Sequence, residues 1–323
     1  MRAFVRESLG AANSPELKME RLLGGMEKRG LFSLKYATIG TRTAEQTFYG
    51  REGNCLSFTI LFVALAREAG LRVNYQMVNS PPVWSSVAGT IVVNNHINTV
   101  IRDRNGPDYT VDFNQLEYTG PYVRRAVSDD FALALFYNNV GAEALIDEDY
   151  ERSFAYLRAA VQAYPWVASA WNNIGLLYMR HERYEHAEAA YLQALRADSR
   201  DRSTVTNLAG LYETIGEDAL AEQYRRDIER HRRKNPYYHF SLAQQAYEEK
   251  DPRQALDALD RAIRLNDEEH QFHFLQGLAL SDLGQEREAM ASFHAARKLA
   301  SADAVKRLYT EQIEALSRNA PAR

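Results

Sequence analysis

The sequence is poor in cysteine and has no long apolar run. Cys55 is the one cysteine in 323 residues, which excludes an intramolecular disulfide and suits a reducing compartment. The longest apolar run, residues 58–66, is too short to span a bilayer, and the N-terminal residues have no signal-peptide core. We therefore expect a cytoplasmic protein without a transmembrane segment. The alternative is a periplasmic or otherwise exported protein whose signal segment was removed.

The sequence also lacks a strong charge of either sign and a complete set of metal ligands. A formal net charge of −4 gives no reason to expect nucleic-acid binding. The basic stretch at 225–234 is typical of a solvated helix end. His270 and His273 share one helix face without a third ligand, and no segment resembles an EF-hand loop. We expect no metal, no cofactor and no nucleic-acid partner.

Length and composition indicate a globular protein of two domains. A chain of 323 residues exceeds what one core usually serves, and its 46% apolar residues are ordinary for a globular chain. Helices are expected near the N-terminus, because Asn13-Ser14-Pro15 is a cap signal before a leucine-containing segment. Residues 41–48 predict a capping box and a short helix.

Cys55 lies where a loop gives way to an apolar segment. Gly53 and Asn54 precede it, and the segment that follows predicts a buried helix with its C-cap at Gly70. A thiolate at that position would be stabilised by unpaired backbone N–H groups and the positive end of the helix dipole. The sequence therefore makes Cys55 a candidate nucleophile. The alternative is a small buried hydrophobic residue, the usual role of a free cysteine.

An alternating pattern replaces the helical one after Leu71 and predicts strands. These are residues 73–78, 89–93, 98–101 and 109–113. Asn105-Gly106 predicts a hairpin turn between the last two. Residues 79–86 contain Pro81-Pro82 and predict a loop, in which Trp84 either lines a substrate cleft or belongs to the core. The N-terminal region is thus expected to be an α+β domain.

Two strand residues are candidate partners for Cys55. A cysteine nucleophile needs a base within hydrogen-bond reach, and the base needs an acceptor that orients it. His96 follows the predicted strand 89–93, and Asp112 lies inside the predicted strand 109–113. Each also has a structural interpretation, His96 as a satisfied strand histidine and Asp112 as a turn cap.

With these residues, the segment 41–114 resembles the transglutaminase-like cysteine superfamily, a branch of the papain-like fold. The matching features are Gly53-Asn54-Cys55 at the start of the central helix, the helix sequence from Phe62 to Leu71, His96 on a strand, and Asp112-Phe113-Asn114 on the next. The resemblance implies a Cys55-His96-Asp112 triad in which Cys55 attacks an amide or acyl carbon, His96 holds the proton and Asp112 orients the imidazole. It also implies an oxyanion site at the Cys55 N–H, with Gln46 or Tyr49 as candidates for the second donor.

The C-terminal half contains a repeat of 34 residues. Small residues recur at this spacing: Gly141, Gly175, Ala209, Ala243 and Gly277; Ala187, Ala221, Ala255 and Ala289. This pattern is similar to that of tetratricopeptide (TPR) repeats, all-α helix pairs that stack into a solenoid. We predict a transglutaminase-like domain at 1–132, five repeats at 133–303, and a capping helix with a tail at 304–323.

One row of the repeats suggests a binding surface. Asn139, Asn173 and Asn207 are spaced by one repeat and are expected to line the inner helices, where such side chains can bind an extended peptide backbone. The alternative is that asparagine is simply common at this position.

The predicted function is that of a thiol-dependent amide or peptide hydrolase whose TPR groove binds a protein or peptide. The resemblance implies a protease, amidase or deamidase, as in many bacterial-type members of the superfamily. Two alternatives remain: a non-enzymatic TPR adaptor with a degenerate first domain, and an acyltransferase that cross-links glutamine to an amine.

Overall fold

The computed structural model describes residues 1–31, 35–37, 39–87, 90–102, 108–112, 124–300 and 303–319; at 79–87 and 90–95 it describes the backbone alone. The chain forms two compact units, one ending at Tyr224 and the other beginning at Arg225. The unit boundary therefore falls inside a helix of the repeat region. The sequence-based division at residues 132/133 remains a prediction about domain type, and the turn predicted at Asn105-Gly106 lies outside the described residues.

Four helices and two short strands precede the main sheet in the described part of the chain: α1 (Arg2–Leu9), α2 (Pro15–Lys28), β1 (Lys35–Tyr36), α3 (Ala44–Gly50), β2 (Glu52–Gly53) and α4 (Cys55–Glu68). The predicted caps are confirmed, since Ser14 caps α2, and Thr43 with Gln46 forms a capping box on α3. Gly70 follows α4 with a φ of 74°, a conformation that suits glycine at a helix end. The short parallel pair β1–β2 is not evident from the sequence.

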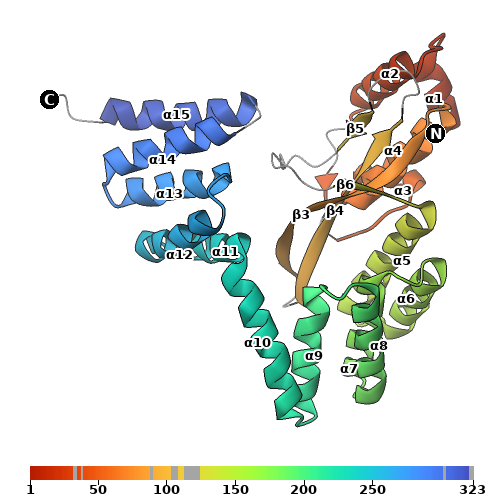
Figure 1. Cartoon of the computed structure of the whole chain (residues 1–323). Coiled ribbons are helices and arrows are strands. Elements are labelled where there is room, and N and C mark those ends of the chain that lie inside the picture. Colours follow the sequence, from red (N-terminus) through yellow and green to blue (C-terminus); the bar gives the residue numbers. More distant parts are fainter. Residues whose placement is uncertain are drawn as a thin grey trace. The chain divides into compact units, whose positions relative to one another are not determined.

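The main sheet is antiparallel and has the strand order β5-β4-β3-β6 (Figure 1). Its strands are β3 (Val73–Val87), β4 (Thr90–Ile101), β5 (Tyr109–Val111) and β6 (Arg124–Val127). The loop predicted at 79–86 is wrong, because β3 continues through it. The pairing register shifts between Val78 and Val83, on either side of Pro81-Pro82, which have no N–H to donate to the ladder.

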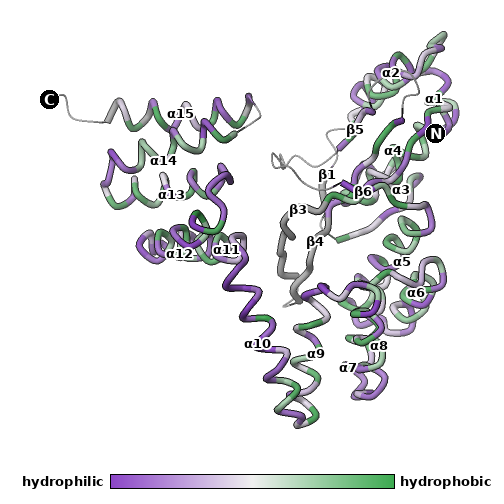
Figure 2. The backbone as a smooth tube through the Cα atoms, in the orientation of Figure 1, coloured by the Kyte–Doolittle hydropathy of each residue, from purple (hydrophilic) through white to green (hydrophobic). Residues whose placement is uncertain are grey.

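The N-terminal core forms around α4. Its buried side chains include Leu61, Phe62, Leu65 and Ala66, which pack with Ile97 and Ile101 of β4. Apolar residues occur almost all round α4, as its hydrophobic colouring in Figure 2 shows, because helices and the sheet cover it. The predicted buried central helix is confirmed.

The repeat region consists of helix pairs followed by a final helix. The elements are α5 (Asp129–Ile146), α6 (Tyr150–Ala163), α7 (Ala168–Arg180), α8 (Tyr184–Ala197), α9 (Arg202–Thr214), α10 (Asp218–Lys234), α11 (Pro236–Glu248), α12 (Pro252–Leu265), α13 (His270–Asp282), α14 (Glu286–Leu299) and α15 (Asp303–Asn319). Gly175 of α7 illustrates why small residues recur, because a Cβ built there would lie 2.4 Å from the Tyr191 ring of α8. The all-α architecture predicted for this half is confirmed.

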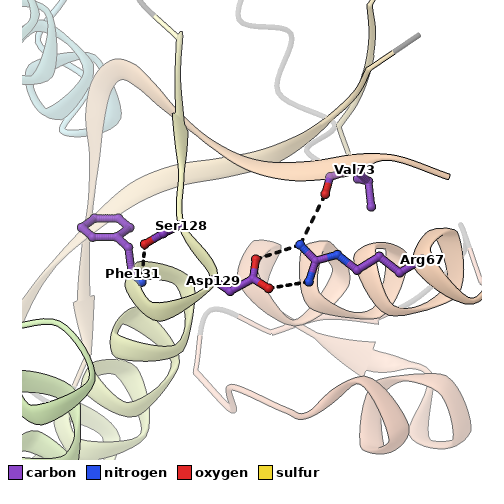
Figure 3. A network of polar contacts seen from close by, with 5 residues as sticks. All are labelled: Arg67, Val73, Ser128, Asp129 and Phe131. Carbon is purple, nitrogen blue, oxygen red and sulfur yellow. Dashed lines mark hydrogen bonds and ion pairs between the residues drawn. The ribbon is translucent and has the colours of Figure 1, made fainter. Parts of the chain in front are cut away.

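Helix α5 contributes buried residues both to the N-terminal core and to a cluster of the repeat region. Ala132 of α5 is buried in the N-terminal core, and Ala134 is buried in a second cluster with residues of α6 and α7. At the start of α5, Asp129 accepts two hydrogen bonds from Arg67 at the end of α4, at 2.6 and 2.7 Å (Figure 3). Helix α5 thus packs against both the N-terminal core and the helices that follow it.

Helix α10 differs from the other repeat helices. Ala221 is its one buried residue among those described, and Figure 2 shows most of the helix as hydrophilic. Its basic C-terminal turn complements the helix dipole, as expected from the sequence. In the part of the chain that the structure describes, every helix is too short or too polar to cross a membrane.

Candidate active site

Cys55 is the first residue of α4 and is half-buried. Asn54 caps the helix: its Oδ1 accepts from the Ser57 backbone N–H at 3.0 Å and from Ser57 Oγ at 2.9 Å. Gly53 packs tightly on this turn, because a Cβ built there would lie 2.7 Å from Ser57 Cβ. The Gly-Asn-Cys sequence therefore combines close packing with a helix cap, and the first-turn N–H groups next to Cys55 have no partner within the helix.

Helix α4 faces β4 through the residue one turn after the cysteine. Thr59 Oγ1 donates to the Ile97 carbonyl at 3.1 Å, and Thr59 lies four residues after Cys55 on the same face of α4. Ile97 adjoins His96 in β4. This contact aligns the cysteine end of α4 with the His96 part of the strand. The sequence reasoning did not identify Thr59, although its i,i+4 spacing from Cys55 was a signal.

His96 contacts both other members of the predicted triad. Its Nε2 lies 2.6 Å from Asp112 Oδ2, and its side chain is also hydrogen-bonded with Cys55. His96 is 3% exposed, whereas Asp112, one residue beyond β5, is partly open to solvent. The structure therefore brings Cys55, His96 and Asp112 together in one site.

Asn98 is a further polar residue of this site. Its Nδ2 donates to Asp112 Oδ2 at 2.9 Å, and the residue is 1% exposed. Asn98 follows His96 by two positions, so both side chains lie on the same face of β4. The ladder pairs Thr99 with Val111, and one further step of this register places Asn98 opposite Asp112. The alternation of side chains along a strand, which puts residues two apart on one face, could have identified Asn98 from the sequence.

The surroundings of His96 change its acidity. Burial disfavours the imidazolium, but the hydrogen bonds with Asp112 and Cys55 and the attraction of their negative charges outweigh it and raise the pKa of His96 to about 9. The imidazole therefore holds its proton at neutral pH. A protonated histidine beside a sulfur and a carboxylate can stabilise an anionic nucleophile and deliver a proton.

The candidate oxyanion donors lie on α3, and both are exposed. Gln46 Oε1 accepts from the Thr43 backbone N–H at 3.0 Å in the capping box, so its amide is part of the helix cap. The Tyr49 ring packs edge-on against Phe48. Trp84 pairs with Val93 in the β3–β4 ladder, and its side chain lies outside the described part. Their predicted roles remain predictions.

The asparagine row is tied together across the repeats. Asn173 Nδ2 donates to Asn138 Oδ1 at 2.9 Å, and Asn207 Nδ2 donates to Asn172 Oδ1 at 2.8 Å. Asn138 also donates to Asn139 Oδ1, at 3.4 Å. Each of Asn139, Asn173 and Asn207 is half-buried and uses one side-chain atom in this ladder. The row therefore joins adjacent repeats, and peptide binding by it remains a prediction.

A groove of about 520 Å³ lies between α6, α7 and α8. Its apolar lining residues include Phe154, Val161, Trp171, Ile174 and Tyr178. The charged side chains in its lining are Arg158 and Arg196, with His186 beside them and no carboxylate among the lining residues. The groove combines an apolar surface with positive charge.

Among the described residues, no cluster of three or more histidine, cysteine or carboxylate side chains has the arrangement of a metal site.

Family models match three parts of the chain. Residues 2–96 match the transglutaminase-like superfamily, and residues 168–201 and 240–304 match tetratricopeptide repeats. The chain therefore joins a transglutaminase-like domain to TPR repeats, and the fusion predicted from the sequence is confirmed. The first match includes Cys55 and ends at His96. Asp112 lies outside it and is grouped with these two residues because of its contact with His96.

The solved structures that resemble the chain include a TPR protein. YrrB, described as having an unusual peptide-binding site, is 17% identical over 55% of this chain and 92% of its own, with a TM-score of 0.30. The pilF protein of Pseudomonas aeruginosa is 16% identical over 59% and 90%, with a TM-score of 0.32. MamA is 16% identical over 52% and 91%, with a TM-score of 0.29. These likenesses carry no conclusion about function. A search of curated proteins finds no match.

Proposed function

We propose that this protein hydrolyses amide or peptide bonds with a Cys55-His96-Asp112 triad, as a protease, amidase or deamidase. The observation that carries the proposal is the position of His96, which is hydrogen-bonded with Cys55 on one side and lies 2.6 Å from Asp112 on the other. A nucleophile, an imidazole and an orienting carboxylate in this order are the requirements of thiol catalysis. Asn98 supports the proposal, because it holds the same carboxylate oxygen.

The first half of the proposed reaction forms an acyl-thioester. The sulfur of Cys55 attacks the carbonyl carbon, the new C–S bond forms, and the carbonyl electron pair moves to oxygen. The oxyanion lies beside the Cys55 N–H at the start of α4, with Gln46 or Tyr49 as the candidate second donor. His96 gives its proton to the leaving nitrogen as the C–N bond breaks, which releases ammonia or an amine.

The second half releases the acid. Neutral His96 takes a proton from water, and the water oxygen bonds to the acyl carbon. The C–S bond then breaks, the carboxylic acid leaves, and the sulfur of Cys55 takes back its electron pair beside the protonated imidazole. Asp112 keeps the ring oriented through both halves, because its Oδ2 holds Nε2 and leaves Nδ1 for the sulfur.

Two alternatives compete with hydrolysis. In a non-enzymatic adaptor only the repeats would act, and the contacts of His96 with Cys55 and Asp112 argue against it. In an acyltransferase the thioester would be attacked by a lysine amine rather than by water. A peptide mixture containing glutamine and asparagine, incubated with a fluorescent primary amine, separates these chemistries: hydrolysis releases ammonia or new peptide ends, and transfer incorporates the amine.

The test of the triad is the reactivity of Cys55. We expect tagged iodoacetamide to alkylate the wild-type protein at about pH 6 at least tenfold faster than the His96→Ala variant, and the two rates to converge near pH 10. Cys55→Ala is the control for labelling at the sole cysteine. If His96→Ala alkylates with the same rate and pH dependence as the wild type, the hydrolase proposal fails and the adaptor is favoured.

TPR repeats suggest protein or peptide binding, and we propose that the groove between α6, α7 and α8 contributes to it. Its apolar lining fits an aromatic or aliphatic side chain, and Arg158 and Arg196 fit carboxylates beside that side chain. The preferred ligand is therefore an acidic segment with an apolar anchor. Such binding would hold a protein substrate on the same compact unit as Cys55, since both lie before Tyr224.

A further inference from the structure

We propose that Glu143, in the first helix of the repeat array, is a positioning residue for the Cys55 end of α4. Three hydrogen bonds end on its Oε1: from the Gly40 backbone N–H at 3.0 Å, from the Thr41 backbone N–H at 2.8 Å and from Thr41 Oγ1 at 2.8 Å. These donors are about a hundred residues earlier in the chain than their acceptor. The inference rests on the proposed role of Cys55, and it adds a residue that lies outside all three family matches.

Thr41 transmits this contact to the helix cap. Its hydroxyl has one proton, which it donates to Glu143, so a lone pair is left to accept from Asn54 Nδ2 at 2.7 Å. Thr41 and Asn54 are both buried. With its Nδ2 held in this way, the Asn54 side chain presents Oδ1 to the Ser57 N–H at the first turn of α4. The carboxylate is therefore connected to the cap of the cysteine helix through one hydroxyl.

Ser57 closes the network on its other side. Ser57 Oγ donates to Asn54 Oδ1 at 2.9 Å and accepts from the Arg42 backbone N–H at 2.9 Å. Residues 40–42 thus contact both the Asn54 cap and the first turn of α4. Linked hydrogen bonds polarise and orient one another in a buried site, so the loss of one member affects the rest.

Helix α5, which carries Glu143, is also held in place by contacts near its N-terminus. At the other end of α5, Asp129 is bonded to Arg67 of α4 (Figure 3). Ala132 of α5 is buried in the core that α4 forms. Helix α5 is therefore connected to both ends of α4. Three hydrogen bonds thus converge on one oxygen of the Glu143 side chain and fix its position. The structure assigns the first repeat to the scaffold of the cysteine site.

Glu143→Ala and Glu143→Gln test this assignment in the full chain. The readout is the rate of Cys55 alkylation by tagged iodoacetamide between about pH 6 and pH 10, because this rate reports the surroundings of the sulfur. We expect Glu143→Ala to slow alkylation at the lower pH about tenfold and to change the pH profile. Glu143→Gln keeps an acceptor at the same place and is expected to be intermediate. Glu151→Ala, an exposed glutamate at the start of α6, is the matched control and should be unchanged.

Thr41→Val separates positioning from folding. Valine matches the shape of threonine but has no hydroxyl, while the two backbone N–H groups remain to hold Glu143. We expect it to reproduce the changed pH profile with folded, monodisperse protein. An unchanged profile in Thr41→Val overturns the proposal, even if Glu143→Ala does not fold. If instead His96→Ala has the same alkylation rate and pH profile as the wild type, the proposed hydrolase fails, whatever the Glu143 variants show.

Discussion

His96 Nε2 lies 2.6 Å from Asp112 Oδ2, and this pair sets the properties of the cysteine site. His96 is buried, so its charged form depends on its partners rather than on water. Asp112 supplies a negative charge beside the imidazole, and Asn98 donates to the same carboxylate oxygen.

Asp112→Asn should lower the pKa of His96 from about 9 towards or below the ordinary histidine value of about 6.5. The substitution removes the charge and the strong acceptor, and burial, which opposes the imidazolium, remains. Histidine ring resonances followed by NMR across the pH range measure the change. The resonances of the exposed His181 serve as an internal reference. A His96 pKa that stays near 9 would show that Asp112 is not its principal stabilising partner.

The raised pKa of His96 also predicts how stability depends on pH. A histidine that binds its proton more tightly in the folded state contributes stability that is fully present below about pH 6.5 and is lost as the pH rises through about 9. We expect the difference in urea midpoint between wild type and His96→Ala to shrink over this window. The cavity that alanine leaves does not depend on pH, so it cannot mimic this trend. A difference that grows from pH 6.5 to pH 9 would contradict the prediction.

Two glycines in the repeats should respond in opposite ways to alanine. Gly175→Ala places a Cβ 2.4 Å from the Tyr191 ring, and we expect it to lower the free energy of unfolding by about 1–3 kcal/mol. Gly210, inside α9, has no heavy atom within 4 Å of its would-be Cβ, so Gly210→Ala should raise stability by up to about 1 kcal/mol. Chemical denaturation of the two variants measures both effects. Equal effects would show that helix propensity, not packing, decides these positions.

Charge reversal in the groove tests the binding proposal. A fluorescent peptide with one phenylalanine flanked by aspartates should bind the wild type, and Arg158→Glu with Arg196→Glu should weaken it about fivefold or more, as measured by anisotropy. Arg183→Glu is the matched control, because this exposed arginine does not line the groove. The same peptide with lysines in place of aspartates should bind weakly. Equal binding of both peptides would remove the groove from the proposal.

The local sequence was sufficient to predict the elements whose signals are short-range. The caps at Ser14 and Thr43 and the helix that begins at Cys55 are found where predicted, and the TPR repeats are present, since capping and periodicity depend on neighbours along the chain. Residues 79–86 were misjudged for the same reason. Pro81-Pro82 is a local loop signal, but pairing with β4 continues on both sides of it.

The order Cys55, His96, Asp112 and their predicted helix and strands came from the sequence alone, and so did the type of each domain. Tertiary structure decided which side chains meet: the His96–Asp112 contact, the support from Asn98, and the hydrogen bonds from residues 40–41 to Glu143. Residues this far apart in the chain are brought together by strand register and helix packing, for which a single sequence holds no local signal. The repeat pattern separates α5 from the first domain, yet burial of Ala132 and the Asp129–Arg67 pair join it to the helix that begins with Cys55.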